Sequence, residues 1–188
     1  FSKARSSADL GELHYGSGKY TEAMTNLEAA IVEHAGNASA WRFLAMSVAK
    51  STNLPAFVAS HAKVCACLEK ARALDADGEF GPVAEAICRN TLAGVAKRGL
   101  IQSTDDARRA WFAFESIDKN MAAKEAAHAL SRAVMCADRL RHLPPEDPRI
   151  GLQVTGLYII VHDEFESLLS LDGNLKRDMA RLHSHFQA

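Results

Sequence analysis

The chain has 188 residues, 48% of them hydrophobic and 24% charged, which is typical of a soluble globular protein of one domain and excludes a disordered or collagen-like chain. With 22 Lys and Arg against 23 Asp and Glu the net charge is −1, so the long-range field that attracts nucleic acid or anionic membranes is missing. No apolar run approaches the roughly 18 residues of a membrane-spanning helix. We therefore expect neither nucleic-acid binding nor membrane insertion.

Apolar residues recur at three- and four-residue spacing along almost the whole chain, which predicts an all-α fold. The first predicted helices are short and form hairpins. They cover residues 6–15, 21–34, 38–50 and about 55–75. The glycines of Gly16-Ser-Gly18 separate the first pair, and Asn53-Leu-Pro55 separates the second.

Longer helices are predicted in the second half. A fifth helix runs from Pro82 to Arg98 and ends before Gly99, because Pro is favoured in the first turn and Gly just past the end. Ser103 is predicted to cap a sixth helix, with Asp106 as the acid of a capping box. Further helices are expected at 120–142, at 148–169 and from Asn174 onward, which gives about nine in all.

A pair of helices recurs with a period of about 40 residues. The helix ends at Leu74-Asp75 and Ile117-Asp118 are 43 residues apart, and Ala30 and Ala71 are 41 apart. The first pair carries small and aromatic residues in the order Leu10, Gly11, Gly18, Tyr20, Ala23, Leu27 and Ala30. This order resembles the signature of the tetratricopeptide repeat family, whose paired helices need small residues where they approach closely. Trp41, Leu44 and Ala45 open a second unit, and Ala107 and Trp111 mark a looser third.

The resemblance implies a helical-hairpin repeat superhelix. Residues 1–120 would form about three tetratricopeptide-like hairpins, because a single hairpin cannot bury its own apolar face. Residues 121–188 would supply C-terminal capping helices, including a degenerate fourth unit. In this family the first helix of each hairpin lines a concave groove that receives an extended or helical peptide. Carried over to this chain, the partner-binding residues would be Arg5, Glu12, Tyr15, Arg42, Met46, Lys50, Asn90, Lys97 and Arg98.

The charges of this lining suggest the kind of partner. Arg42, Lys50, Lys97 and Arg98 are basic and Glu12 is the only acid, so we expect an amphipathic segment with acidic residues. One subclass of the family grips the C-terminal carboxylate of chaperones with Lys and Asn side chains. Ala8, Glu12 and Phe43 stand at those places, so we do not expect this carboxylate to bind.

These patterns predict a non-catalytic protein–protein interaction module that acts as an adaptor or assembly scaffold. The alternative is a permanent structural subunit of a larger complex, docked through its convex or terminal surface, with nothing bound transiently in the groove. A separate alternative for the lining is that the chain's own C-terminal helices fill some of it. A helical-repeat RNA reader or an enzyme is less favoured, because base-reading repeats, nucleophile elbows, phosphate loops and dinucleotide fingerprints are missing from the sequence. His162 and Glu166 have the spacing of metal ligands or an acid–base pair but lack a third ligand, so no metal or cofactor is expected.

The four cysteines are Cys65, Cys67, Cys88 and Cys136, and none forms the C-x2-C pair of a zinc site. Reduced and buried thiols are therefore expected, which suits the cytoplasm or an organelle matrix. The chain begins at Phe1 rather than Met, so we expect a processed product or part of a longer protein.

Overall fold

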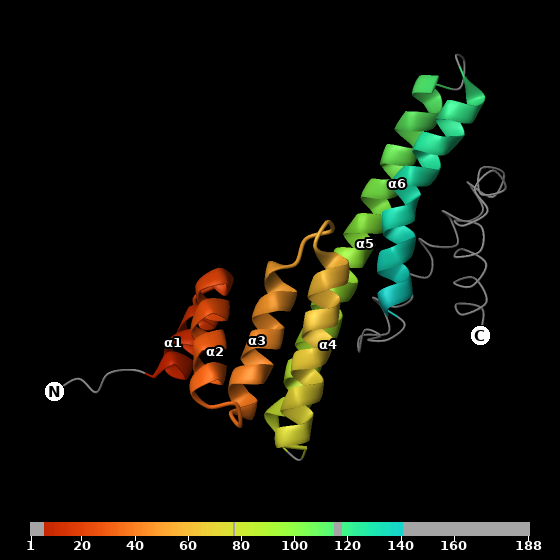
Figure 1. The fold of residues 1–188 in the computed structure, drawn as a ribbon. Helices are drawn as coiled ribbons and strands as arrows, with labels where there is room; N and C mark the ends of the chain where they lie inside the picture. The colour runs from red at the N-terminus through yellow and green to blue at the C-terminus, as the bar shows by residue number, and fades with distance from the viewer. Residues whose placement is uncertain (1–5, 77, 115–117, 141–188) are drawn as a thin grey trace. The chain divides into compact units, whose positions relative to one another are not determined.

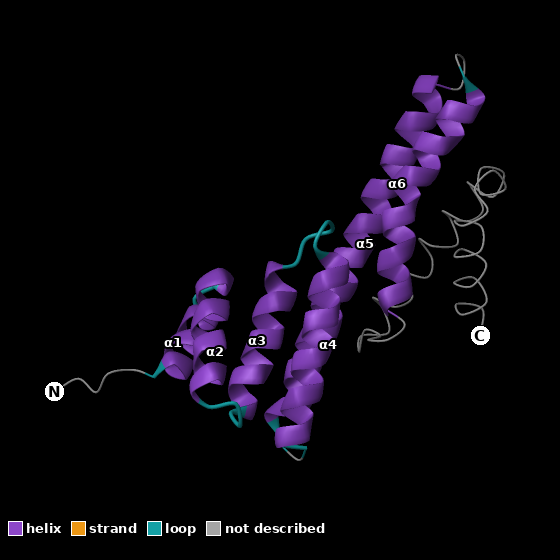
Figure 2. Ribbon diagram, in the orientation of Figure 1, coloured by secondary structure: helices purple, strands orange, loops and turns teal. Residues whose placement is uncertain are grey.

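The structure of the chain is a computed structural model that describes residues 6–76, 78–114 and 118–140 (Figure 1). The described residues form six helices and no strand, so the all-α prediction is confirmed for them (Figure 2). They belong to two compact units, residues 1–92 and 93–188, whose boundary falls inside the fifth helix. The helices predicted at 148–169 and from Asn174 lie outside the described residues.

The first unit contains four complete helices, which stand side by side in chain order (Figure 1). They are α1 (Ser7–Gly16), α2 (Tyr20–Glu33), α3 (Ala38–Ser51) and α4 (Phe57–Leu74). A fifth helix, α5, begins in this unit at Phe80. The ends of α1 to α4 lie within about two residues of the predicted ones, because end signals and apolar periodicity agree there.

Local hydrogen bonds explain where these helices begin. The Ser6 hydroxyl accepts from the backbone N–H of Asp9 at 3.2 Å while the Asp9 carboxylate accepts from Ser6 N–H at 3.1 Å, which completes a capping box before α1. Gly18 has a φ of 75°, a left-handed conformation that allows the tight turn into α2. The Asn37 side chain accepts from Ala40 N–H at 3.0 Å and caps α3.

Neighbouring helices of the first unit run in opposite directions. Side-chain contacts join the start of one helix to the end of another: Ser7 with Glu33, Met24 with Ser51, Arg42 with Asp75, and Arg72 with Glu85. Helix α1 also contacts α3 directly. It follows that α1, α3 and the beginning of α5 point the same way, and that α2 and α4 point the opposite way.

Small residues allow the helices to pack closely. A Cβ atom added to Gly11 of α1 would lie 2.5 Å from Cγ of Leu27 in α2, so only Gly fits there. The core of the first unit is otherwise made of alanines and a few larger side chains. Fully buried examples are Ala23, Leu27, Ala40, Ala45, Met46, Ala49, Phe57 and Val64.

Helix α5 is longer than the sequence predicted. It runs unbroken from Phe80 to Phe114 over 35 residues, whereas separate helices were predicted on either side of Gly99. Thr104 is buried, and its hydroxyl donates to the Leu100 carbonyl at 2.7 Å within the same helix. Asp106 pairs with Arg109 at 2.7 Å instead of closing a capping box. A side-chain hydroxyl that donates to a carbonyl of the same helix does not act as a cap, so the helix continues through it.

The second unit contains the remainder of α5 and the whole of α6 (Lys119–Leu140). The bounds of α6 lie within about two residues of the helix predicted at 120–142. In the described part of the chain, no helix is both long enough and apolar enough to span a membrane.

Candidate partner-binding surface

Four aromatic rings of the first unit contact one another in succession. The ring centroid of Tyr15 is 5.7 Å from that of Tyr20 and 5.4 Å from that of Phe43, and the Phe43 centroid is 5.3 Å from that of Phe80. We call this set, Tyr20, Tyr15, Phe43 and Phe80, the aromatic row. Its rings are tilted or edge-on to one another, which is the favoured geometry for aromatic contacts.

The aromatic row crosses several helices. Tyr15 comes from α1, Phe43 from α3 and Phe80 from the start of α5, which are the helices that point the same way. Tyr15, Tyr20 and Phe43 are half-buried, and Phe80 is 36% exposed. Each ring therefore packs against the protein on one side and offers apolar surface on the other.

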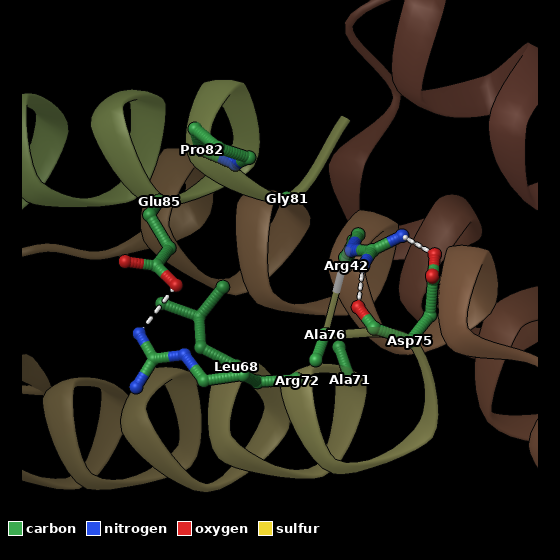
Figure 3. A pocket seen from close by; sticks show the side chains of 9 residues that line it. All are labelled: Arg42, Leu68, Ala71, Arg72, Asp75, Ala76, Gly81, Pro82 and Glu85. Atoms are coloured by element: carbon green, nitrogen blue, oxygen red, sulfur yellow. Dashed lines mark hydrogen bonds and ion pairs between the residues drawn. The ribbon is translucent and has the colours of Figure 1, made fainter. Parts of the chain in front are cut away.

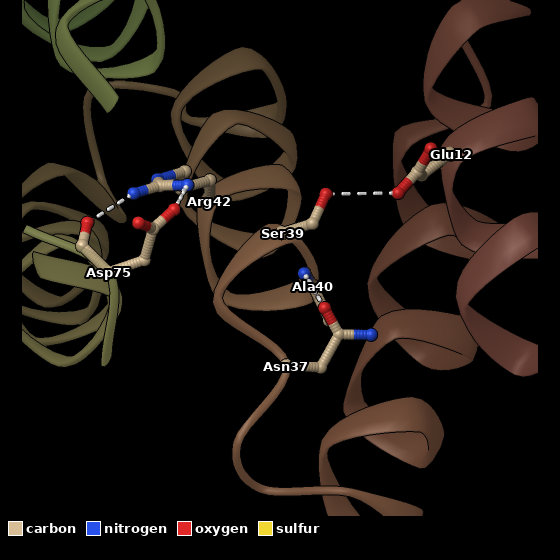
Figure 4. A network of polar contacts seen from close by, with 6 residues as sticks. All are labelled: Glu12, Asn37, Ser39, Ala40, Arg42 and Asp75. Atoms are coloured by element: carbon tan, nitrogen blue, oxygen red, sulfur yellow. Dashed lines mark hydrogen bonds and ion pairs between the residues drawn. The ribbon is translucent and has the colours of Figure 1, made fainter. Parts of the chain in front are cut away.

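Polar groups border the aromatic row. The Ser39 hydroxyl donates to Oε1 of Glu12 at 3.1 Å, which ties α3 to α1 one turn before the rings (Figure 4). Lys50 lies seven residues after Phe43, so it shares that face of α3, and it is exposed. No hydrogen bond or ion pair holds Lys50 within the described ranges.

Burial and neighbouring ionisable groups shift the pKa values of Tyr15 and Cys88. Burial raises the pKa of the Tyr15 hydroxyl, and the neighbouring Tyr20 and Cys88 raise it further. Burial also raises the pKa of Cys88, to about 12, against the opposing charge of Lys50. Cys88 is thus within electrostatic range of both Tyr15 and Lys50 in the first unit.

Arg42 is buried, whereas the sequence had suggested an exposed position in the lining of a partner-binding groove. It is only 5% exposed; Nη1 donates to Oδ2 of Asp75 at 2.8 Å, and Nη2 donates to the Asp75 carbonyl at 2.7 Å (Figure 4). A Cβ atom on Gly78 would lie 2.8 Å from Nη2 of Arg42, so the turn before α5 wraps around the guanidinium. Arg42 is a structural clamp between α3 and the end of α4.

A pocket of about 220 Å³ lies next to this clamp (Figure 3). Its lining comes from α3, α4 and the start of α5 and consists of Arg42, Leu68, Ala71, Arg72, Asp75, Ala76, Gly81, Pro82 and Glu85. Its cations are already paired, Arg42 with Asp75 and Arg72 with Glu85. The pocket therefore offers little net charge to a ligand.

The other predicted partner-binding residues have different positions. Met46 is fully buried in α3, so it cannot contact a partner in this conformation. Arg5 lies outside the described residues. Asn90 is half-buried in the first unit, whereas Lys97 and Arg98 belong to the second unit, half-buried and exposed respectively. Of the nine predicted residues, Glu12, Tyr15 and Lys50 border or form the aromatic row.

Phe43 and Phe80 were not among the predicted partner-binding residues. Tyr15, Phe43 and Phe80 are separated by 28 and 37 residues, so a search for one constant period cannot align them. An aromatic residue in, or just before, the first helix of each predicted hairpin was the available signal.

The thiols of the described residues are poor nucleophiles. All four cysteines are free. Burial raises the pKa of Cys67 to about 11 and that of Cys136 to about 12. Cys65 lies 3.8 Å from Nδ1 of His61, yet burial raises the pKa of this thiol as well. A catalytic thiolate needs a lowered pKa.

In the described part of the chain, no group of three or more His, Cys, Asp or Glu side chains could hold a metal ion. His162 and Glu166 lie outside it. Neither a protein-family model, nor a curated protein, nor a solved structure shows significant similarity to the chain.

Proposed function

We propose that the chain is a non-catalytic protein–protein interaction module, an adaptor or assembly scaffold of the tetratricopeptide-like helical-repeat class. It binds a peptide or partner helix along the first helices of its hairpins. The aromatic row is the observation that carries this proposal, because its contiguous, half-exposed rings offer apolar surface on α1, α3 and the start of α5.

The packing of the first unit supports the repeat class. Its helices alternate in direction, α1 contacts α3 as well as α2, and Gly11 fits closely against Leu27. Stacked helical hairpins need these features, because each hairpin buries its apolar face against the next.

The chemistry of the row supports partner binding. Tyr and other aromatic residues are enriched at the energetic centres of protein interfaces, since they supply large apolar area with few rotatable bonds. The tyrosine hydroxyls add hydrogen-bonding capacity at one end of the row.

A second candidate is a permanent structural subunit that docks through another surface. Phe112 of α5 favours it, because this side chain is 73% exposed in the second unit. Exposed apolar side chains mark an interface where they form a larger patch, and Ile101, Met121 and Met135 of the same unit are exposed as well.

Selection of peptides on the purified protein tests the proposal. A phage-displayed library of random peptides would be panned on the full chain, and recovered peptides would be synthesised and measured by calorimetry. Phe80→Ser should weaken their binding about tenfold, which corresponds to about 1.4 kcal/mol. Val32→Ser is the matched control, because Val32 of α2 is 87% exposed and lies outside the row.

Circular dichroism of each variant checks that the fold is intact. Peptides that bind Phe80→Ser and Tyr15→Ser as tightly as the unmodified chain would exclude the aromatic row. Dependence on Phe112 instead would favour the structural subunit.

A further inference from the structure

We infer that the aromatic row receives an amphipathic α-helix whose apolar stripe has basic residues along one edge and acidic residues along the other. This inference rests on the proposed function and names its partner by chemistry.

The spacing of the rings favours a helix. Successive centroids are 5.3 to 5.7 Å apart. One turn of an α-helix rises about 5.4 Å, so side chains one turn apart meet successive rings. Two residues of a strand span about 6.7 Å, and one turn of polyproline II spans about 9.3 Å. The repeats of extended partners are therefore longer than the ring spacing, and one helical turn matches it best.

The two borders of the row carry opposite charges. Glu12 lies three residues before Tyr15, about 4.5 Å along the axis of α1. Lys50 lies seven residues after Phe43, about 10.5 Å along the axis of α3 toward its C-terminal end, whereas Glu12 lies toward the N-terminal end of α1. Because α1 and α3 run parallel, the acid and the base fall on opposite sides of a helix lying along the row.

Both charged groups are able to bind a partner. Ser39 occupies only Oε1 of Glu12, which leaves Oε2 to accept a hydrogen bond from a Lys or Arg of the partner. Lys50 is exposed and shares the face of α3 that carries Phe43, seven residues before it. Its ammonium group is therefore available to an acidic side chain of the partner.

This partner differs from the acidic segment suggested by the sequence. That expectation counted Arg42, whose guanidinium is buried against Asp75. It also counted Lys97 and Arg98, which belong to the second unit. Within the first unit, Lys50 is the exposed cation of that set that borders the row, and Glu12 opposes it.

Three designed peptides test the inference on the full chain. Each has about 18 residues, or five helical turns, and the same leucine stripe. The edges are Lys and Glu in the split peptide, Lys on both sides in the basic peptide, and Glu on both sides in the acidic peptide. Fluorescence anisotropy at low salt should show the split peptide binding about fivefold tighter than either uniform one.

Charge reversal sharpens the test. Lys50→Glu makes both borders acidic, so the basic peptide should become the preferred one. Lys70→Glu is the matched control, because Lys70 is an exposed residue of α4 and the change in net charge is the same. It should leave the split peptide preferred.

Equal binding of the three peptides, no binding of any, or the same shift of preference in Lys50→Glu and Lys70→Glu would overturn the inference. If charge has no effect but Phe80→Ser weakens every peptide, the proposed surface stands and only the inference fails. If Phe80→Ser weakens none of them, nor any peptide selected by phage display, the proposed surface fails too.

Discussion

The two units of the chain reach a helical structure by different means. In the first, helices of 10 to 18 residues are ended by caps and turns, and each packs on the next through small residues. In the second, the rest of α5 and α6 continue without such interruption and leave Phe112, Met121 and Met135 exposed. Ser6 caps a helix and Ser103 does not, although both precede an acid by three residues. A capping motif therefore ends a helix only where packing also requires a turn.

The largest expected effect contrasts a buried and an exposed phenylalanine. Phe57 of α4 is 0% exposed, so Phe57→Ala should lower the free energy of unfolding by about 3–5 kcal/mol. Phe112→Ala in the second unit should change it by less than about 0.5 kcal/mol, because that side chain is mostly in solvent. Urea denaturation followed by circular dichroism measures both. Equal losses would mean that Phe112 is covered.

Proline substitution tests the continuity of α5. Thr104→Pro removes a backbone N–H in the middle of this helix and should cost about 3 kcal/mol. Had Ser103 been an N-cap, proline would occupy the first helical position and be tolerated. Ala38→Pro provides that case in the first unit, since Asn37 caps α3, and should cost less than about 1 kcal/mol. Similar stability of the two variants, with unchanged helix content, would show a break in α5.

Removing an ion pair in each unit should give a smaller difference in stability between the units. Asp75→Asn leaves the buried Arg42 without its carboxylate and should lower stability by about 1–2 kcal/mol, reduced from the fully buried case because Asp75 is half-exposed. Asp106→Asn breaks an exposed pair with Arg109 and should cost less than about 0.5 kcal/mol. Thermal melts of the two variants provide the comparison. A larger loss for Asp106→Asn would contradict the clamp.

The smallest effect, absent at neutral pH, concerns the thiols. Folding raises the pKa of Cys67, Cys88 and Cys136 above 9, so the folded chain keeps protons that the unfolded chain releases. Stability is then unaffected below pH 9 and falls as the pH rises toward 11 or 12. At pH 8, Ellman's reagent should label half-buried Cys65 first and all four thiols only after denaturation. Labelling of Cys136 as fast as Cys65 would mean looser packing in the second unit.

The ends of α1 to α4 could be predicted from the sequence because their signals are local. Asn37 acts on Ala40, and Gly18 on the turn beside it. The burial of Arg42 could not, because its partner Asp75 is 33 residues away and the fit depends on Gly78. The burial of Met46 could not be predicted either. Periodicity assigns a residue to a face of its helix, but it does not show whether another helix covers that face. The unbroken α5 was missed because the satisfaction of Thr104 by Leu100 depends on the helix already being formed.

The glycine-lined turn around Arg42 also limits how the chain can be divided. A fragment ending at Leu74 would keep the guanidinium and lose its carboxylate, so the second hairpin is completed by residues that follow it. The hairpins of the first unit are therefore not interchangeable modules. Insertions between Asp75 and Gly81 would disturb α3 as well as the turn itself. Shortened versions of the first unit therefore need to carry this turn with the hairpin before it.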